Sequence, residues 1–124
     1  MQRVSSGSPY EDEFGFSRAV RVGDTVRVAG TGPVWPDGSC DPDPGAQAER
    51  CLEIIATALE EAGASLHEVV RTRMYLTDPD HAAAVGHAHA RAFGEARPAA
   101  TMVVVAGLVD PRWVVEIEAE AMLV

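Results

Sequence analysis

Two stretches of this 124-residue sequence carry apolar residues at helical spacing, and its other apolar stretches alternate at the spacing of strands. The first helical stretch runs from Ala46 to Ala62, and Gly63 follows where a helix would end. The second begins at Asp78-Pro79, with the aspartate as N-cap and the proline in the first turn, and runs to about Phe93. Each helix therefore has one apolar face that must pack against another element.

The strand-like segments are residues 16–22 and 25–31, joined by a tight turn, and then residues 69–76, 101–106 and 113–122. Residues 33–45 hold four prolines and two glycines, which predicts an irregular loop with at most one small extra strand. Residues 1–14 are expected to be a polar lead-in with a solvated acidic run at 11–13, and residues 65–68 a single helical turn.

This succession of segments predicts the element order β-β-α-β-α-β-β. Two amphipathic helices and one sheet favour an α+β fold, a two-layer sandwich in which a mixed sheet carries both helices on one face. A chain of this length and ordinary globular composition fits a single domain over residues 1–124.

The strand pattern also predicts which side chains lie on the sheet face away from the helices. On the last strand the apolar alternation leaves Glu116, Glu118 and Glu120 opposite. We expect Val69, Arg71, Arg73 and Tyr75 on the same open face, with Arg21 and Arg27 alternating in the same way against Val20, Val22, Val26 and Val28. Such a face is either a solvated ladder of arginines and glutamates or, in part, a surface that closes against a neighbouring subunit.

Composition and charge exclude several classes of protein. The longest apolar runs are too short to span a bilayer and the N-terminus lacks the apolar core of a signal peptide, so we expect a cytoplasmic protein with no membrane partner. Cys40 and Cys51 have no metal-ligand spacing, which suits reduced thiols. The formal net charge of −9 would repel a phosphate backbone, which argues against nucleic acid as a partner.

The C-terminal quarter resembles a known family signature. Residues Arg97-Pro98-Ala99-Ala100-Thr101-Met102, followed by Val115-Glu116-Ile117-Glu118-Ala119, are similar to the paired strands of the RidA family, also called YjgF and formerly endoribonuclease L-PSP. Phe16-Ser17-Arg18-Ala19-Val20, Val28-Ala29-Gly30 and Val70-Arg71-Thr72 extend the resemblance over nearly the whole chain. The resemblance implies a chorismate mutase-like fold, a homotrimer with a small-molecule cleft at each subunit interface, and hydrolysis of reactive imines or enamines, with 2-iminobutanoate and 2-iminopropanoate as the family's substrates.

Carried over residue by residue, the resemblance predicts a divergent site. Glu116 matches the glutamate that orders the hydrolytic water, whereas Ala100 stands where the family has the arginine that grips the substrate carboxylate. Phe16 matches a tyrosine, and Met102 a position that is often cysteine. Thr101 lies between Ala100 and Met102 and is expected to contact the same substrate. Further departures are Ala29 in place of a serine and Gly86 in place of an asparagine.

Two residues are candidates to replace the missing arginine. Arg73 brings the same fork of donors from another strand, although arginines in structural ion pairs are common. His89 can act as a proton shuttle if it reaches the cleft, but its apolar helix face also favours a packed core histidine. Gly32, in Gly30-Thr31-Gly32, is expected to let a substrate or a neighbouring chain approach the backbone.

No cofactor or metal is expected. His87 and His89 point roughly 200° apart on a helix and cannot share an ion. The leading hypothesis is therefore a RidA-like hydrolase of imine or enamine metabolites, with Glu116 positioning water and Arg73 holding an anionic group. The alternative is a non-catalytic protein of the same family that binds a metabolite, and a nuclease is disfavoured by charge.

Overall fold

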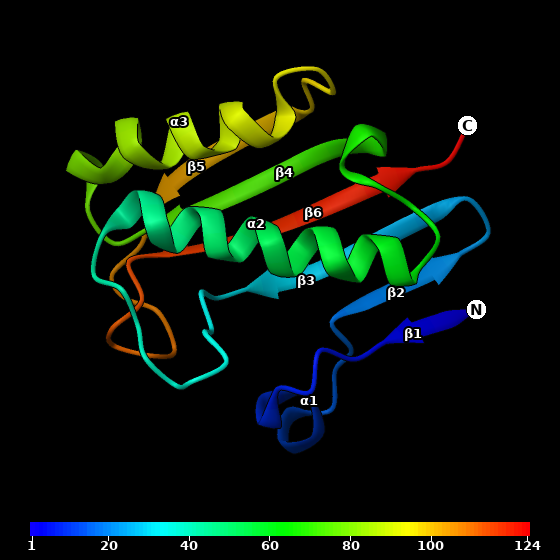
Figure 1. Cartoon of the computed structure of the whole chain (residues 1–124), viewed down its shortest axis with the longest axis horizontal. Helices are drawn as coiled ribbons and strands as arrows, with labels where there is room; N and C mark the ends of the chain where they lie inside the picture. The colour runs from blue at the N-terminus through cyan, green and yellow to red at the C-terminus, as the bar shows by residue number, and fades with distance from the viewer.

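The computed structural model describes all residues from Met1 to Val124 and contains one mixed sheet with its long helices on one face (Figure 1). In chain order the elements are β1 (Gln2–Val4), α1 (Pro9–Phe14), β2 (Ala19–Val22), β3 (Thr25–Thr31), α2 (Pro44–Glu61), η1 (Leu66–Glu68), β4 (Val69–Leu76), η2 (Pro79–His81), α3 (Ala82–Phe93), β5 (Ala99–Val104) and β6 (Val115–Met122). The predicted α+β class and the two-layer arrangement are confirmed.

The sheet has six strands in the order β1-β2-β3-β6-β4-β5. Only β4 and β5 are parallel, with α3 as the crossover between them, and every other neighbouring pair is antiparallel. The C-terminal strand β6 is therefore inserted between β3 and β4, next to the middle of the sheet, which places Glu116 beside residues from both halves of the chain.

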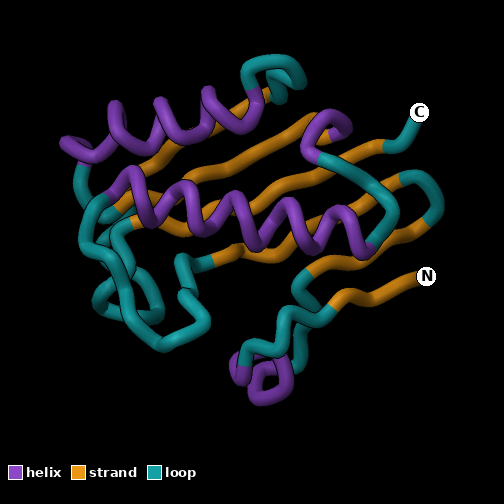
Figure 2. The backbone as a smooth tube through the Cα atoms, viewed as in Figure 1, coloured by secondary structure: helices purple, strands orange, loops and turns teal.

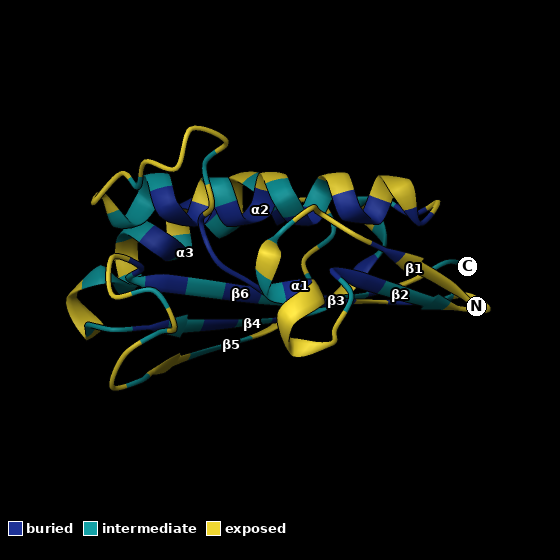
Figure 3. Ribbon diagram, turned by 90° about the horizontal axis from the view of Figure 1, so that it is seen from below, coloured by how far each residue is buried: buried dark blue, intermediate teal, exposed yellow.

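The core lies between the helices and one face of the sheet (Figure 3). The largest fully buried apolar side chains are contributed by both layers: Ile55, Leu59, Val85 and Phe93 from the helices and Val26, Leu76, Val115 and Ile117 from the sheet. The alternation predicted for β6 is confirmed, since Val115, Ile117, Ala119 and Ala121 are buried. The glutamates between them therefore lie on the open face.

Both long helices begin after an aspartate, but in different ways. Asp43 caps α2, because its Oδ2 accepts a hydrogen bond of 2.9 Å from the backbone N of Ala46. Asp78 instead caps the short η2, accepting 2.8 Å from the backbone N of Asp80, and α3 follows only at Ala82. The second helix thus starts with a 3-10 turn, a common geometry at helix ends.

The N-terminal segment differs from the prediction. Residues 1–14 are not a polar lead-in: they form β1, paired with β2, and the helix α1. Glu11, predicted as part of a solvated run, is only 4% exposed. The proline-rich loop, in turn, contains no strand.

Two side-chain orientations on the sheet were also predicted wrongly. The tight turn pairs Arg21 with Val26, so Arg21 faces the helices and its Nη1 donates 2.8 Å to the carbonyl of Ala62 at the end of α2. A bulge between Val69 and Arg71 buries Val69 under the helices and leaves Val70 44% exposed, the reverse of the expected alternation. Of these two changes, the position of Arg21 places a cation near the free carbonyls at the C-terminal end of α2.

The loops at residues 32–43 and 105–114 lie side by side at one end of the sheet (Figure 2). Gln47, fully buried at the start of α2, joins them, since its Nε2 donates 3.0 Å to the Arg112 carbonyl and 2.8 Å to the Asp41 carbonyl. Its Oε1 accepts 2.8 Å from the backbone N of Val114. None of the helices combines the length and the apolar character needed to cross a membrane.

Candidate functional site

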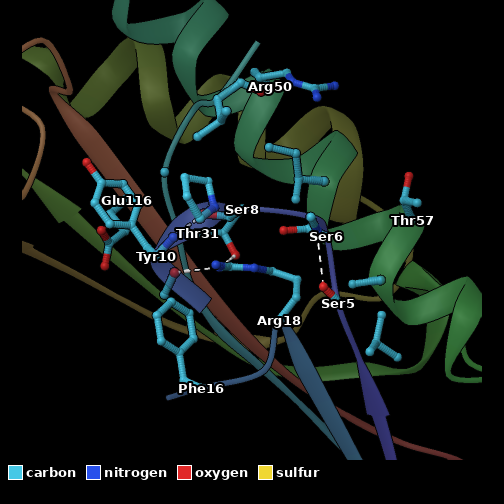
Figure 4. Close-up of a pocket in the computed structure, with 18 of the residues that line it drawn as sticks. Ser5, Ser6, Ser8, Tyr10, Phe16, Arg18, Thr31, Arg50, Thr57 and Glu116 are labelled. Atoms are coloured by element: carbon cyan, nitrogen blue, oxygen red, sulfur yellow. Dashed lines mark hydrogen bonds between the residues drawn. The ribbon is translucent and has the colours of Figure 1, made fainter. Parts of the chain in front are cut away.

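A cleft of about 550 Å³ lies between the N-terminal arm, which we define as residues 4–16, the end of β3 and the outer side of α2 (Figure 4). Trp113, from the loop before β6, and Glu116 contribute to the same cleft. Its walls therefore come from four separate parts of the chain.

The catalytic candidate Glu116 lies in this cleft, on the open face of β6 opposite Tyr75 of β4. Burial raises the pKa of Glu116 above its ordinary value, with a further rise from Glu118 and an opposing effect from the positive charge of Arg18. A carboxyl group with a raised pKa and access to a cleft is suited to exchange protons with water or a ligand.

Two glycines at the end of β3 make room for the site. A β-carbon at Gly30 would collide with the carboxylate of Glu116, and one at Gly32 would lie 2.5 Å from the ring of Trp113. Within this chain the group that approaches Gly32 is the indole ring of Trp113, whereas the sequence prediction named a substrate or a neighbouring chain. Neither glycine has a positive φ, so side-chain contact rather than backbone conformation constrains them, and the rigid indole beside Gly32 can yield less than the flexible end of Glu116 beside Gly30.

Arg18 is the polar centre of the cleft, and the sequence analysis did not select it. The residue precedes β2 and is 6% exposed. Its Nη1 donates to the Gly30 carbonyl at 2.7 Å and to Oγ1 of Thr31 at 3.0 Å, and its Nε lies 3.4 Å from Oε2 of Glu11. The two Nη1 bonds hold the guanidinium against the end of β3, and the Nε contact ties it to the N-terminal arm.

Glu11 ties the N-terminal arm to Arg18. Its carboxylate accepts hydrogen bonds from the Ser5 hydroxyl at 3.0 Å, from the Ser6 backbone N at 3.1 Å and from the Ser6 hydroxyl. Burial acts to raise the pKa of Glu11, but the bonds from Ser6 and Ser5 and the charge of Arg18 outweigh it and hold the pKa below its ordinary value. Glu11 is therefore a buried carboxylate that stays ionised.

Aromatic rings form the apolar wall. Tyr10 stacks on Phe14 with ring centroids 5.8 Å apart and meets Trp113 edge-on at 6.5 Å. The predicted substrate contact Phe16 lines the same cleft, with the guanidinium carbon of Arg18 5.4 Å from its ring centroid. A small ligand here would meet ring faces on one side and Arg18 with Glu116 on the other.

Other candidates from the sequence lie outside this cleft. Arg73 is on β4, where its Nη1 lies 3.4 Å from Glu120 and 3.9 Å from Glu118, so its charge is already paired. His89 shares a hydrogen bond of 2.8 Å with Thr72, and its ring centroid lies 4.7 Å from that of Phe93. Burial lowers the pKa of His89, which favours the neutral ring. These contacts are those of a packed histidine.

The residues around the missing arginine lie on β5, at the edge of the sheet and two strands away from Glu116. Ala100 is exposed, Thr101 accepts 2.6 Å from Nη2 of Arg71, and Met102 packs against the core beside Gly86. Within one chain these residues do not meet the cleft.

No cluster of three or more His, Cys, Asp or Glu side chains is arranged to hold a metal ion. Cys51 is buried in the core, and burial raises its pKa, as it does for Cys40. Neither thiol is activated as a nucleophile.

Comparison with known proteins assigns relatives to the chain. Residues 9–123 match the family described as Endoribonuclease L-PSP. An uncharacterised Streptomyces coelicolor protein, SCO2049, is 41% identical over 122 residues, which cover 98% of this chain and 91% of that protein. The crystal structure of Rv2704 from Mycobacterium tuberculosis, a member of the YjgF/YER057c/UK114 family, superposes with a TM-score of 0.91 at 47% identity and covers 98% of both chains. The structure of E. coli TdcF with bound serine gives a TM-score of 0.83 at 25% identity, covering 98% of this chain and 94% of TdcF.

Proposed function

The chain belongs to the Endoribonuclease L-PSP family, which includes YjgF and RidA, and from this we propose that it hydrolyses a small reactive imine or enamine. The observation that carries the proposal is Glu116, a partly buried carboxyl group with a raised pKa in a cleft between Arg18 and aromatic rings. The size of the cleft suits a metabolite, and the serine bound in TdcF shows that a relative accepts a ligand of that kind.

In the proposed reaction Glu116 moves one proton. Its carboxylate takes a proton from water while the water oxygen bonds to the imine carbon, and it returns this proton to the imine nitrogen as the C=N π bond breaks. The carbinolamine that results loses ammonia: the hydroxyl proton moves to the nitrogen, the C–N bond breaks and the C=O bond forms. An acid–base group of this kind typically contributes about 10²- to 10⁴-fold to a rate.

Non-catalytic binding of a metabolite is the second candidate function, and a specific observation favours it. Ala100 carries no charge, and Arg73 lies outside the cleft, where it pairs with Glu118 and Glu120, so neither places a guanidinium in the cleft in place of the family arginine. A cleft can bind a keto acid or a related compound without accelerating any step.

We also propose a homotrimer with clefts completed at the subunit interfaces. The open sheet face supports this, because it exposes Val70 and Val103 beside the Arg73–Glu120 pair. In such an assembly Ala100, Thr101 and Met102 of a neighbouring copy would approach the cleft. Light scattering tests it: a mass near three times 13.2 kDa is expected, and a mass near 13.2 kDa contradicts it. The free thiols Cys40 and Cys51 support a reducing compartment, which we propose is the cytoplasm.

The deaminase reaction is tested with freshly generated 2-aminoacrylate or 2-iminobutanoate. We expect the wild-type protein to accelerate their loss over buffer and Glu116→Gln to reduce the acceleration by about 10²-fold or more. Arg73→Ala tests whether Arg73 holds an anionic group of the substrate, as the sequence predicted. Arg91→Gln, which removes an exposed charge on α3, is the matched control. No acceleration by folded wild-type protein, or an acceleration that Glu116→Gln leaves intact, contradicts the enzyme and favours the binding protein.

A further inference from the structure

We propose that Arg18 binds the carboxylate of the ligand. Arg18 contacts the end of β3, whereas the family arginine is missing from β5 at the edge of the sheet. The proposal rests on the proposed function for the choice of a small metabolite as ligand. Its own basis is the geometry of the guanidinium, which lines the cleft and is held by the chain through Nη1 and Nε, with Nη2 left unpartnered.

The three nitrogens of Arg18 have different surroundings. Nη1 is used by Gly30 and Thr31, and Nε faces Glu11. Nη2 makes no hydrogen bond within the chain, and this nitrogen is not fully buried. Because the side chain is only 7% exposed, the accessible part of this group opens into the cleft that Arg18 lines. Its two N–H groups are donors without an acceptor.

The charge balance selects a carboxylate over a more highly charged group. Glu11 lies 3.4 Å from Arg18 and offsets much of its charge, and Glu116 lies in the same cleft. A singly charged carboxylate can accept a hydrogen bond from Nη2 of the guanidinium, whereas a phosphate dianion would meet strong repulsion from both glutamates. The aromatic wall would then receive the apolar end of the ligand.

The test measures binding of 2-oxobutanoate and of its neutral isostere 2-oxobutanamide by NMR titration. The wild-type protein should bind the acid with a dissociation constant of about 1 mM or below and the amide at least about 10-fold more weakly. Arg18→Gln should remove this preference for the acid, whereas Arg91→Gln, with the same change of net charge, should keep it. The Arg18 Nε–H signal should shift with the acid and not with the amide.

Glu11→Gln supplies a sharper control. An Arg18 that binds the ligand and a purely structural Glu11–Arg18 pair predict opposite changes in affinity for the acid. Glu11→Gln keeps hydrogen-bonding groups at the arm but leaves Arg18 uncompensated, so the acid should bind more tightly, by about 3- to 10-fold. A purely structural Glu11–Arg18 pair would instead make Glu11→Gln bind more weakly. If Arg18→Gln alone fails to fold, the double variant Glu11→Gln/Arg18→Gln exchanges the ion pair for two neutral amides and should also lose the preference.

Each result decides for or against the proposal. Absence of any preference for the acid in the wild-type protein, or a preference that survives in folded Arg18→Gln or in the double variant, overturns it. Acid binding that requires Arg18 without any imine hydrolysis would retain the proposal and reject the enzyme. Hydrolysis that requires Glu116 but not Arg18 would do the reverse.

Discussion

Replacing Glu11 by alanine should destabilise the protein by about 3 kcal/mol, the lower end of the range for breaking a buried ion pair. The structure sets the size of the effect. The carboxylate is 4% exposed, accepts bonds from both Ser5 and Ser6, and lies against an arginine that is 6% exposed. Alanine leaves the guanidinium without its counter-charge and the serine donors without their acceptor. The low end of the range applies because Nη2 of Arg18 has no partner in the chain and can be hydrated from the cleft.

The assay is urea unfolding at one protein concentration, with Glu60→Ala on the exposed side of α2 as the control. Glu11→Ala should lower the midpoint with little change in slope, and Glu11→Gln should lie between it and the wild type, because the amide retains part of the hydrogen bonding. The effect should also depend on pH. The pKa of Glu11 is lowered in the folded protein, so its contribution is present above the unfolded pKa of about 4.3 and is lost as pH falls through the lower folded pKa. A Glu11→Ala variant within about 0.5 kcal/mol of the wild type at pH 7 would refute the reasoning.

Three further predictions concern the cleft and the helix start. The rate of imine loss should rise with pH through the raised pKa of Glu116, and a rate that falls over the same pH range would contradict the base role. Glu116→Gln should flatten this pH profile. The same variant should raise the free energy of unfolding at pH 7, since a neutral amide is less costly to bury. Gly32→Ala should displace the Trp113 ring, shift its fluorescence and destabilise by about 1–3 kcal/mol, and an unchanged spectrum would show that the contact is absent. Asp43→Ala should lower stability by about 1 kcal/mol in the same urea assay through loss of the bond to Ala46, and no loss would mean that the cap contributes nothing.

The strongly periodic parts of the chain were predictable. Seven apolar positions of the first helix and the four buried positions of β6 follow 3.6- and 2-residue periods over long runs, and they fix which face is buried. The place of Glu116 on the open face follows from the same alternation.

Predictions failed where long-range contact decides orientation. Arg21 lies under the helix end because the turn pairs it with Val26 and because the Ala62 carbonyl accepts its hydrogen bond. Val69 is buried because a single bulge reverses the alternation at the start of β4. Neither the turn register nor a bulge leaves a periodic signal in a short strand.

The sequence by itself determined the two long helices, the strands from β2 onward, the two-layer class and the face on which Glu116 lies, because these depend on local spacing and on the burial of apolar stripes. Only the tertiary structure decided what surrounds Glu116. Glu11 and Arg18 are seven residues apart and look like ordinary surface charges, but pairing of β1 with β2 folds the arm back and buries both at the end of β3. Burial turns two solvated charges into a fixed pair in which only Nη2 of Arg18 lacks a partner, and burial is a property of the whole fold.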